Sequence, residues 1–194
     1  MRENYPKNLC GIDEAGRGPF AGPLVVAGVV LKKDIKELDD SKKLSEKKRE
    51  SLFDLIKQNS IYHIVFKSNE DIDTLGISKC LQDSIKEIIK TIDAKGYLMD
   101  GNTAFGIPNL NYLIKADGKI KEVSAASILA KVSRDRYMCK EALKYPEYLF
   151  EKHKGYGTKA HIEAIKKYGY SKLHRRSFKI KQLESLNIKE PTLF

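Results

Sequence analysis

The chain has 194 residues, a length at which one compact domain can bury a core without disulfide bonds. Hydrophobic residues make up 41% of it, which excludes wholesale disorder. The formal net charge of +10 is unevenly placed: residues 1–118 hold 18 basic and 18 acidic side chains, whereas residues 119–194 hold 18 basic and 8 acidic ones. This asymmetry is typical of a protein that binds a polyanion, although a solvated lysine-rich face would also account for it.

The three cysteines are far apart, and no C-x-x-C pair occurs, so the sequence suggests neither a disulfide framework nor a zinc knuckle. The first residues lack the apolar stretch of a signal peptide. The longest apolar run, residues 24–31, is too short to cross a bilayer. We therefore expect a cytoplasmic protein that is not bound to a membrane.

The first predicted elements are two strands, at residues 9–15 and 24–31. The loop between them, residues 16–23, is rich in Gly and Pro, which would interrupt any helix or strand. The second strand is a continuous apolar segment rich in β-branched residues, which is typical of a strand covered on both faces. A helix capped by Ser45 runs to about residue 58, and a third strand follows at residues 61–66.

Helices and strands continue to alternate through the rest of the chain. A helix is predicted at residues 77–92, strands at 97–100 and 110–116, and helices at 123–143 and 158–168. Mixed strands with helices between them predict an α/β domain. The last quarter is helical and basic, and we expect it to form an appendage on one side of the sheet.

Three of the predicted strands end in acidic residues, namely Asp13 with Glu14, then Asp100, then Asp117. In open α/β sheets the functional site lies outside the strand ends. Carboxylates that converge there repel one another unless a cation neutralises them, and Mg²⁺ or Mn²⁺ is suited to oxygen ligands. Asp-Gly is also an ordinary turn signal, so Asp100 and Asp117 could each mark only a turn. Asp13 and Glu14 have no such turn role.

Other catalytic motifs are missing from the sequence. It contains no H-E-x-x-H, no G-x-S-x-G and no G-x-x-x-x-G-K-[ST]. The G-R-G at residues 16–18 does not extend to a dinucleotide fingerprint, because residue 21 is Ala. This loop could present backbone groups to a sugar hydroxyl, or its glycines could only turn the chain.

Several ordered motifs resemble one family. G-I-D-E-A-G-R-G-P at residues 11–19 closely resembles the opening signature of type 2 ribonuclease H (ribonuclease HII). The resemblance continues with D-S-K-K-L from residue 40, D-G-N from 100, K-A-D from 115, S-A-A-S-I-L-A-K-V-S-R-D from 124 and K-G-Y-G-T from 154. The related ribonuclease HIII group has an extra N-terminal domain and a Glu where this chain has Asp117, so the motifs favour type 2.

The resemblance implies a ribonuclease H-like mixed five-stranded sheet flanked by helices, with a C-terminal helical appendage. Residues 1–145 would form the catalytic core, and residues 146–194 a basic helical region packed on it as part of one compact unit. The implied enzyme is an endoribonuclease that cuts the RNA strand of RNA–DNA hybrids. It would also nick duplex DNA 5′ of a single embedded ribonucleotide, leaving 3′-hydroxyl and 5′-phosphate ends, as in ribonucleotide excision repair. The alternative is a non-catalytic basic nucleic-acid-binding protein, which would have no reason to keep four acids at strand ends.

The resemblance also assigns residue roles. The ligands of two Mg²⁺ or Mn²⁺ ions would be Asp13, Glu14, Asp100 and Asp117. The ribose readers would be Gly16, Arg17, Gly18 and Tyr156, with the loop contacting the 2′-hydroxyl and the ring packing on the next, deoxy sugar. The expected phosphate contacts are Lys42, Lys43, Ser124, Lys131 and Arg134.

The densest basic cluster lies near the C-terminus and consists of Lys172, His174, Arg175, Arg176 and Lys179. It is interpreted as a duplex-backbone contact, with a solubilising tail as the alternative. The segment Q-L-E-S-L at residues 182–186 loosely resembles a sliding-clamp peptide. The family resemblance further implies a monomer.

Overall fold

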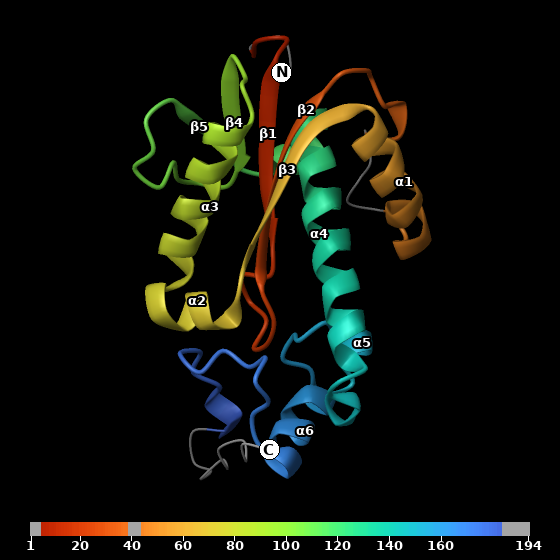
Figure 1. Ribbon diagram of the computed structural model, residues 1–194, viewed down its shortest axis with the longest axis vertical. Helices are drawn as coiled ribbons and strands as arrows, with labels where there is room; N and C mark the ends of the chain where they lie inside the picture. The colour runs from red at the N-terminus through yellow and green to blue at the C-terminus, as the bar shows by residue number, and fades with distance from the viewer. Residues whose placement is uncertain (1–4, 39–43, 184–194) are drawn as a thin grey trace.

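The computed structural model describes residues 5–38 and 44–183 (Figure 1). Lys42 and Lys43, two of the expected phosphate contacts, lie outside these residues. A mixed five-stranded sheet forms the centre, in the order β3-β2-β1-β4-β5, which confirms the predicted fold class. The strands are β1 (Leu9–Ala15), β2 (Leu24–Leu31), β3 (Ser60–Lys67), β4 (Gly96–Asp100) and β5 (Leu110–Leu113).

Strand direction places the acidic residues at one edge of the sheet. β1 is antiparallel to β2 but parallel to β4, and β4 is parallel to β5. Ile12 is paired with Met99, and Asp100 is paired with Leu113. The three strands that carry or precede the acids therefore run in the same direction, and their carboxyl ends meet.

Helices cover both faces of the sheet. They are α1 (Glu46–Gln58), α2 (Asn69–Leu75), α3 (Ile77–Thr91), α4 (Lys121–Ala142), α5 (Phe150–His153) and α6 (Lys159–Tyr168). Alternate residues of β2 point to opposite faces: Val26 packs in a cluster with α2 and α3, and Val25 in one with α1 and α4. β2 is thus covered on both faces, as its continuous apolar sequence predicts.

The long helix α4 lies directly on β1. A Cβ atom added to Gly11 would come within 2.2 Å of the backbone carbon of Glu122, so only glycine permits this approach. Ala125, Ala126 and Ala130 are fully buried at the same contact. The alanine-rich face therefore serves close helix–sheet packing, and it brings the first turns of α4 next to the acidic edge.

Two segments differ from the sequence predictions. β5 ends at Leu113 rather than at residue 116, because Lys115 takes a left-handed conformation (φ 59°) and a 3-10 turn, Ala116–Gly118, follows. Helix α2 was not predicted. It begins with a capping box between Ser68 and Asp71, a pattern that the sequence does contain.

The C-terminal region packs at the far end of α4, where Figure 1 shows α5, α6 and the last described residues below the sheet. Its apolar cluster includes Phe150 and Ile165 together with Ala21 and Met138 from the first 145 residues. A bridge also pairs Ala21 with His174. The three cysteines are free. Among the described residues, no helix is both long and apolar enough to span a membrane.

Candidate active site

Three of the four predicted carboxylates lie together. Asp13, Asp100 and Asp117 each offer an oxygen within 4.8 Å of those of the other two. The parallel register of β1 and β4 sets Asp13 beside Asp100. The 3-10 turn after β5 then returns Asp117 to the same edge.

Backbone and hydroxyl groups hold these acids in place. The Asp100 Oδ1 atom accepts a hydrogen bond from the Ala116 N–H (2.7 Å). The Ser124 Oγ atom lies 2.7 Å from the carbonyl oxygen of Asp117 and 2.9 Å from that of Leu38, and its one proton is shared between these two acceptors. Ser124 is buried, and its hydroxyl lies against both carbonyls. These contacts give Ser124 a role in positioning the backbone of Asp117, and the expected phosphate contact of Ser124 stays a prediction.

Glu14 lies next to the cluster and is paired with Arg17. Its Oε1 atom is 3.3 Å from the Arg17 Nη1 atom. Its Oε2 atom is buried without a hydrogen-bond partner among the described residues. Burial raises the pKa of Glu14, an effect that Arg17 opposes. A buried carboxylate oxygen with no donor is a group that a cation would satisfy.

The electrostatics of the cluster fit a hard divalent cation. Burial, followed by the neighbouring Glu14 carboxylate, raises the pKa of Asp13 well above its usual range. Asp100 and Asp117 act in the same direction on that pKa. All the donor atoms are oxygens, which suit Mg²⁺ or Mn²⁺, and the cluster offers none of the sulfur or imidazole ligands that mark zinc sites.

A shallow hollow of about 300 Å³ adjoins the acids. Its lining comes from β1, the loop at residues 16–23 (the glycine loop), α4 and the loop before α6: Glu14, Ala15, Gly16, Arg17, Gly18, Ser127, Lys131 and Tyr156. The structure thus brings the expected ribose readers and Lys131 together. The Lys131 Nζ atom pairs with Asp135 (2.8 Å) and lies 5.9 Å from the centre of the Tyr156 ring.

Ser127 is a lining residue that the sequence reasoning missed. It is half-buried, four residues before Lys131 on α4. Side chains four apart lie on the same face of a helix, so this spacing was the signal that could have found it. Ser127, and not Ser124, is among the residues that line this hollow.

Two arginines that were expected to contact nucleic acid are buried, namely Arg134 from the expected phosphate contacts and Arg175 from the basic cluster near the C-terminus. Arg134 donates to the carbonyl oxygens of Ala21, Pro23 and Lys154. Arg175 donates to those of Gly16, Arg17 and Gly22. Each arginine is only 1% exposed. They hold the glycine loop and residues 154–158 (the Tyr156 loop) in place, and their burial keeps them from a duplex.

The expected basic cluster is divided in the same way. His174 is buried along with Arg175, so the prediction that these two contact a duplex was wrong. Lys172, Arg176 and Lys179 are exposed. These three remain accessible to a polyanion.

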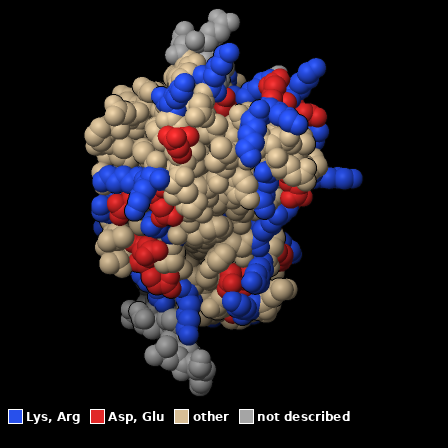
Figure 2. Space-filling view, turned by 45° about the horizontal axis from the view of Figure 1, so that its top comes forward, with Lys and Arg blue, Asp and Glu red and all other residues tan. Residues whose placement is uncertain are grey.

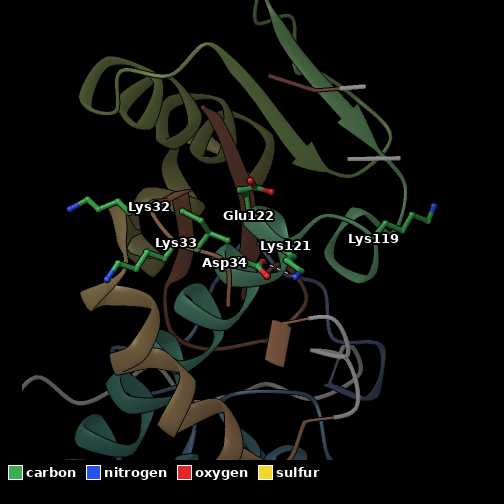
Figure 3. Close-up of a pocket in the computed structure, with 7 residues that line it drawn as sticks. Lys32, Lys33, Asp34, Lys119, Lys121 and Glu122 are labelled. Carbon is green, nitrogen blue, oxygen red and sulfur yellow. Dashed lines mark hydrogen bonds and ion pairs between the residues drawn. The ribbon is translucent and has the colours of Figure 1, made fainter. Parts of the chain in front are cut away.

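A second hollow, of about 380 Å³, lies where β2 ends and α4 begins (Figure 3). Two of its lining residues, Lys121 and Asp34, form an ion pair (2.7 Å). Lys32, Lys33 and Lys119 point in different directions in Figure 3, so their ammonium groups do not converge on one ligand. Lys119 also lines a small pocket with Asp117, so this basic rim borders the acidic cluster.

Comparisons with known proteins agree with this geometry. The family model for ribonuclease HII matches residues 10–181. Ribonuclease HII of Sulfurovum sp. (strain NBC37-1) is 60% identical over 99% of this chain and 100% of its own length. The Aliarcobacter butzleri (strain RM4018) protein is 65% identical over 91% and 93%. The structure of the PCNA:RNase HII complex from Archaeoglobus fulgidus superposes with a TM-score of 0.79 at 29% identity, covering 90% of this chain and 96% of that one. The chain therefore belongs to the ribonuclease HII family, whose members are metal-dependent ribonucleases H of type 2 that act on RNA–DNA hybrids.

Proposed function

We propose that the protein hydrolyses the RNA strand of hybrids and also nicks duplex DNA 5′ of a lone ribonucleotide, as in ribonucleotide excision repair. The products would carry 3′-hydroxyl and 5′-phosphate ends. One observation supports this above others: Glu14 both lines the hollow beside Tyr156 and lies against the acidic cluster. A nucleotide whose sugar occupies the hollow would therefore have its phosphate next to the carboxylates.

Asp13, Glu14, Asp100 and Asp117 would hold two divalent ions, Mg²⁺ or Mn²⁺. When bound, such ions activate the attacking water and stabilise the leaving oxygen. The carboxylates are prepared for that task because the Ala116 N–H fixes Asp100 and Ser124 fixes Asp117. Without cations their negative charge would repel the phosphodiester backbone, so cleavage should depend on added metal.

The hollow supports discrimination by the sugar. A Cβ atom on Gly18 would have no neighbour within 4 Å, so the loop leaves room at that position for a substrate. Tyr156 is 42% exposed and lines the same hollow. Backbone groups of the loop would read the 2′-hydroxyl, and the flat ring would pack on the next, deoxy sugar. Lys131 and Ser127 would contact the adjoining phosphate.

A sliding clamp is the second partner that we propose. The Archaeoglobus fulgidus relative is described in a complex with PCNA, and residues 182–186 resemble a clamp peptide. Leu183 is buried in the C-terminal apolar cluster, so binding through this segment would require it to leave. Residues from 184 onward lie outside the described part. Retention of the protein on immobilised clamp would support the idea, and no retention would end it.

The main experiment uses a DNA duplex with one ribonucleotide, incubated with Mg²⁺ or Mn²⁺ and, as a control, with a chelator. We expect one nick on the 5′ side of the ribonucleotide, with a 3′-hydroxyl end that a polymerase extends. An all-RNA strand paired with DNA serves as the second substrate. Binding to both duplexes with no cleavage above the chelator control would favour the non-catalytic binder.

A further inference from the structure

A chain of hydrogen bonds runs through the C-terminal region to the backbone of Tyr156. The Ser171 N–H donates to the Nδ1 atom of His174 (2.8 Å). The Nε2 atoms of His174 and His161 lie 3.0 Å apart. The Nδ1 atom of His161 then lies 3.0 Å from the Tyr156 carbonyl oxygen.

The two ends of this chain fix its direction. A backbone N–H can only donate, so His174 Nδ1 accepts and the His174 proton resides on Nε2. His161 Nε2 must accept that proton, which leaves the His161 proton on Nδ1. A carbonyl can only accept, so His161 donates to Tyr156. Both rings are therefore neutral, each in one defined tautomer.

The surroundings preserve this arrangement. His161 and His174 are 0% and 1% exposed. Burial lowers the pKa of His161 to about 4, and burial together with His161 lowers the pKa of His174 to about 3. His153 stacks on His161 with ring centres 4.4 Å apart. The Gly155 N–H donates to His153 Nδ1 (3.2 Å), so His153 in turn donates from Nε2 to the Tyr148 carbonyl oxygen (2.7 Å).

Three successive carbonyls of the Tyr156 loop are thus held from three directions. Arg134 donates to the carbonyl of Lys154, and the Phe20 N–H donates to that of Gly155 (2.8 Å). The carbonyl of Tyr156 accepts from the Thr158 N–H within the loop (2.8 Å) and also from His161. The first two donors tie the loop to the glycine loop and α4. Only His161 comes from the C-terminal histidine pair.

We propose that His161 and His174 are positioning residues that set the place of the Tyr156 ring relative to the glycine loop. They act through the Tyr156 carbonyl and do not contact substrate. This inference rests on the proposed function of Tyr156 as a sugar reader. Through Tyr156, the buried histidines would contribute to the selectivity for a single ribonucleotide over a continuous RNA strand.

Two substitutions of His161 separate the two ends of its ring. In His161→Asn the side-chain amide can occupy the Nδ1 position and still donate to Tyr156. In His161→Gln the amide reaches the Nε2 position, next to His174, and leaves no donor at Nδ1. We expect His161→Gln to lower kcat/KM for the single-ribonucleotide duplex at least about 10-fold, with a smaller loss on the all-RNA hybrid. His161→Asn should restore most of the difference. Equal losses on both substrates, or equal behaviour of the two variants, would overturn the proposal.

A measurement on the wild-type protein tests this chain of hydrogen bonds without an activity assay. Nitrogen-15 NMR of the imidazoles at pH 7 should show His161 protonated on Nδ1, and His174 and His153 protonated on Nε2. An Nε2-protonated His161 would contradict the proposed direction, even if the variants fail to fold.

Tyr156→Ala distinguishes the two levels of the argument. If this variant keeps wild-type activity on both substrates, the proposed reader role of Tyr156 fails, whatever the tautomers. If Tyr156→Ala loses the single-ribonucleotide substrate selectively but His161→Gln does not, the positioning role fails alone. We expect the double variant, His161→Gln with Tyr156→Ala, to lose no more selectivity between the two substrates than Tyr156→Ala alone. Both changes remove the same function, so their effects should not add.

Discussion

At the scale of single residues, the acidic cluster imposes an electrostatic cost on folding that a cation would relieve. Asp13 is buried beside Asp100 and Glu14, and its pKa is raised, first by burial. A carboxyl whose pKa is higher in the folded than in the unfolded chain stabilises the fold fully below the unfolded value of about 3.9. That stabilisation is lost as the pH rises through the folded value. The folded chain therefore carries this cost at high pH, when the cluster is ionised without metal.

Asp13→Asn should raise the melting temperature of the metal-free protein at pH 8, because it removes one buried charge. For a chain of this size, each kcal/mol gained corresponds to about 2–4 °C. Thermal unfolding in a chelator measures the change, with the exposed Asp93→Asn as the matched control. Added Mg²⁺ or Mn²⁺ should stabilise the wild type more than Asp13→Asn. A lower melting temperature in chelator would show that the charge is not a cost.

Asp100→Asn should abolish cleavage while hybrid binding remains. The amide retains an oxygen that can accept from the Ala116 N–H, so the local backbone should be kept, whereas the charge is lost. Because loss of a residue that merely supports a metal ligand costs about 10–100-fold, loss of a ligand should cost at least about 100-fold. Cleavage and gel-shift assays on one hybrid measure both properties. A variant that cuts at the wild-type rate would refute the assignment of Asp100 as a ligand.

The sequence indicated the location of the acidic residues in the fold better than the location of the basic residues. Asp13 lies near the end of a buried apolar strand, and few structural roles explain a carboxylate there. Arg134 and Arg175 have the charge expected of a phosphate contact, but each meets three backbone carbonyls of loops distant in sequence. Such partners depend on the tertiary fold, so the sequence could not reveal that these two guanidinium groups are buried.

At the scale of elements, the glycine loop combines two requirements within three residues. Gly16 has a φ of 100°, and a Cβ atom there would lie 2.4 Å from the Arg134 Nε atom. Gly18 has neither constraint. Gly16 therefore shapes the loop, whereas Gly18 leaves space in front of it.

Gly18→Ala should fold normally and yet act poorly on ribonucleotide substrates. We expect its free energy of unfolding to stay within about 0.5 kcal/mol of wild type, while that of Gly16→Ala falls by about 1–3 kcal/mol. Denaturant unfolding measures both values, and KM for the single-ribonucleotide duplex should rise in Gly18→Ala. If KM is unchanged in that variant, the substrate does not approach the loop at Gly18.

The limits of β5 show which element boundaries a sequence can indicate. The sequence from residue 110 to 116 predicts a longer strand than the one observed. The strand stops because Lys115 turns to a positive φ, which lets the Ala116 N–H reach the Asp100 carboxylate on the neighbouring strand. A left-handed lysine has no local signal, since its cause is a contact between segments.

At the scale of the whole molecule, the uneven charge of the sequence does not correspond to one catalytic region and a separate region that binds nucleic acid. Residues 119–194 include α4, which packs on β1, and the buried Arg134 and Arg175. On the face drawn in Figure 2, Lys and Arg side chains lie around a largely uncharged centre. Because Ala21 packs among residues of the C-terminal region, we propose that residues 1–145 and 146–194 form one unit.

The exposed part of the basic cluster provides the last test. If Lys172 and Lys179 bind phosphates, Lys172→Gln combined with Lys179→Gln should weaken hybrid binding at low salt. The slope of log affinity against log salt should also become shallower by about 0.9 for each phosphate that is no longer neutralised. A matched pair, Lys86→Gln with Lys90→Gln, removes the same charge from the exposed face of α3. Binding of a hybrid measured between about 50 and 200 mM salt compares the pairs.

If both pairs reduce the slope equally, the positive charge acts only through the overall field, and the solubilising interpretation of these lysines holds. A reduction confined to the first pair would extend the duplex-binding surface from the acidic edge to the C-terminal region.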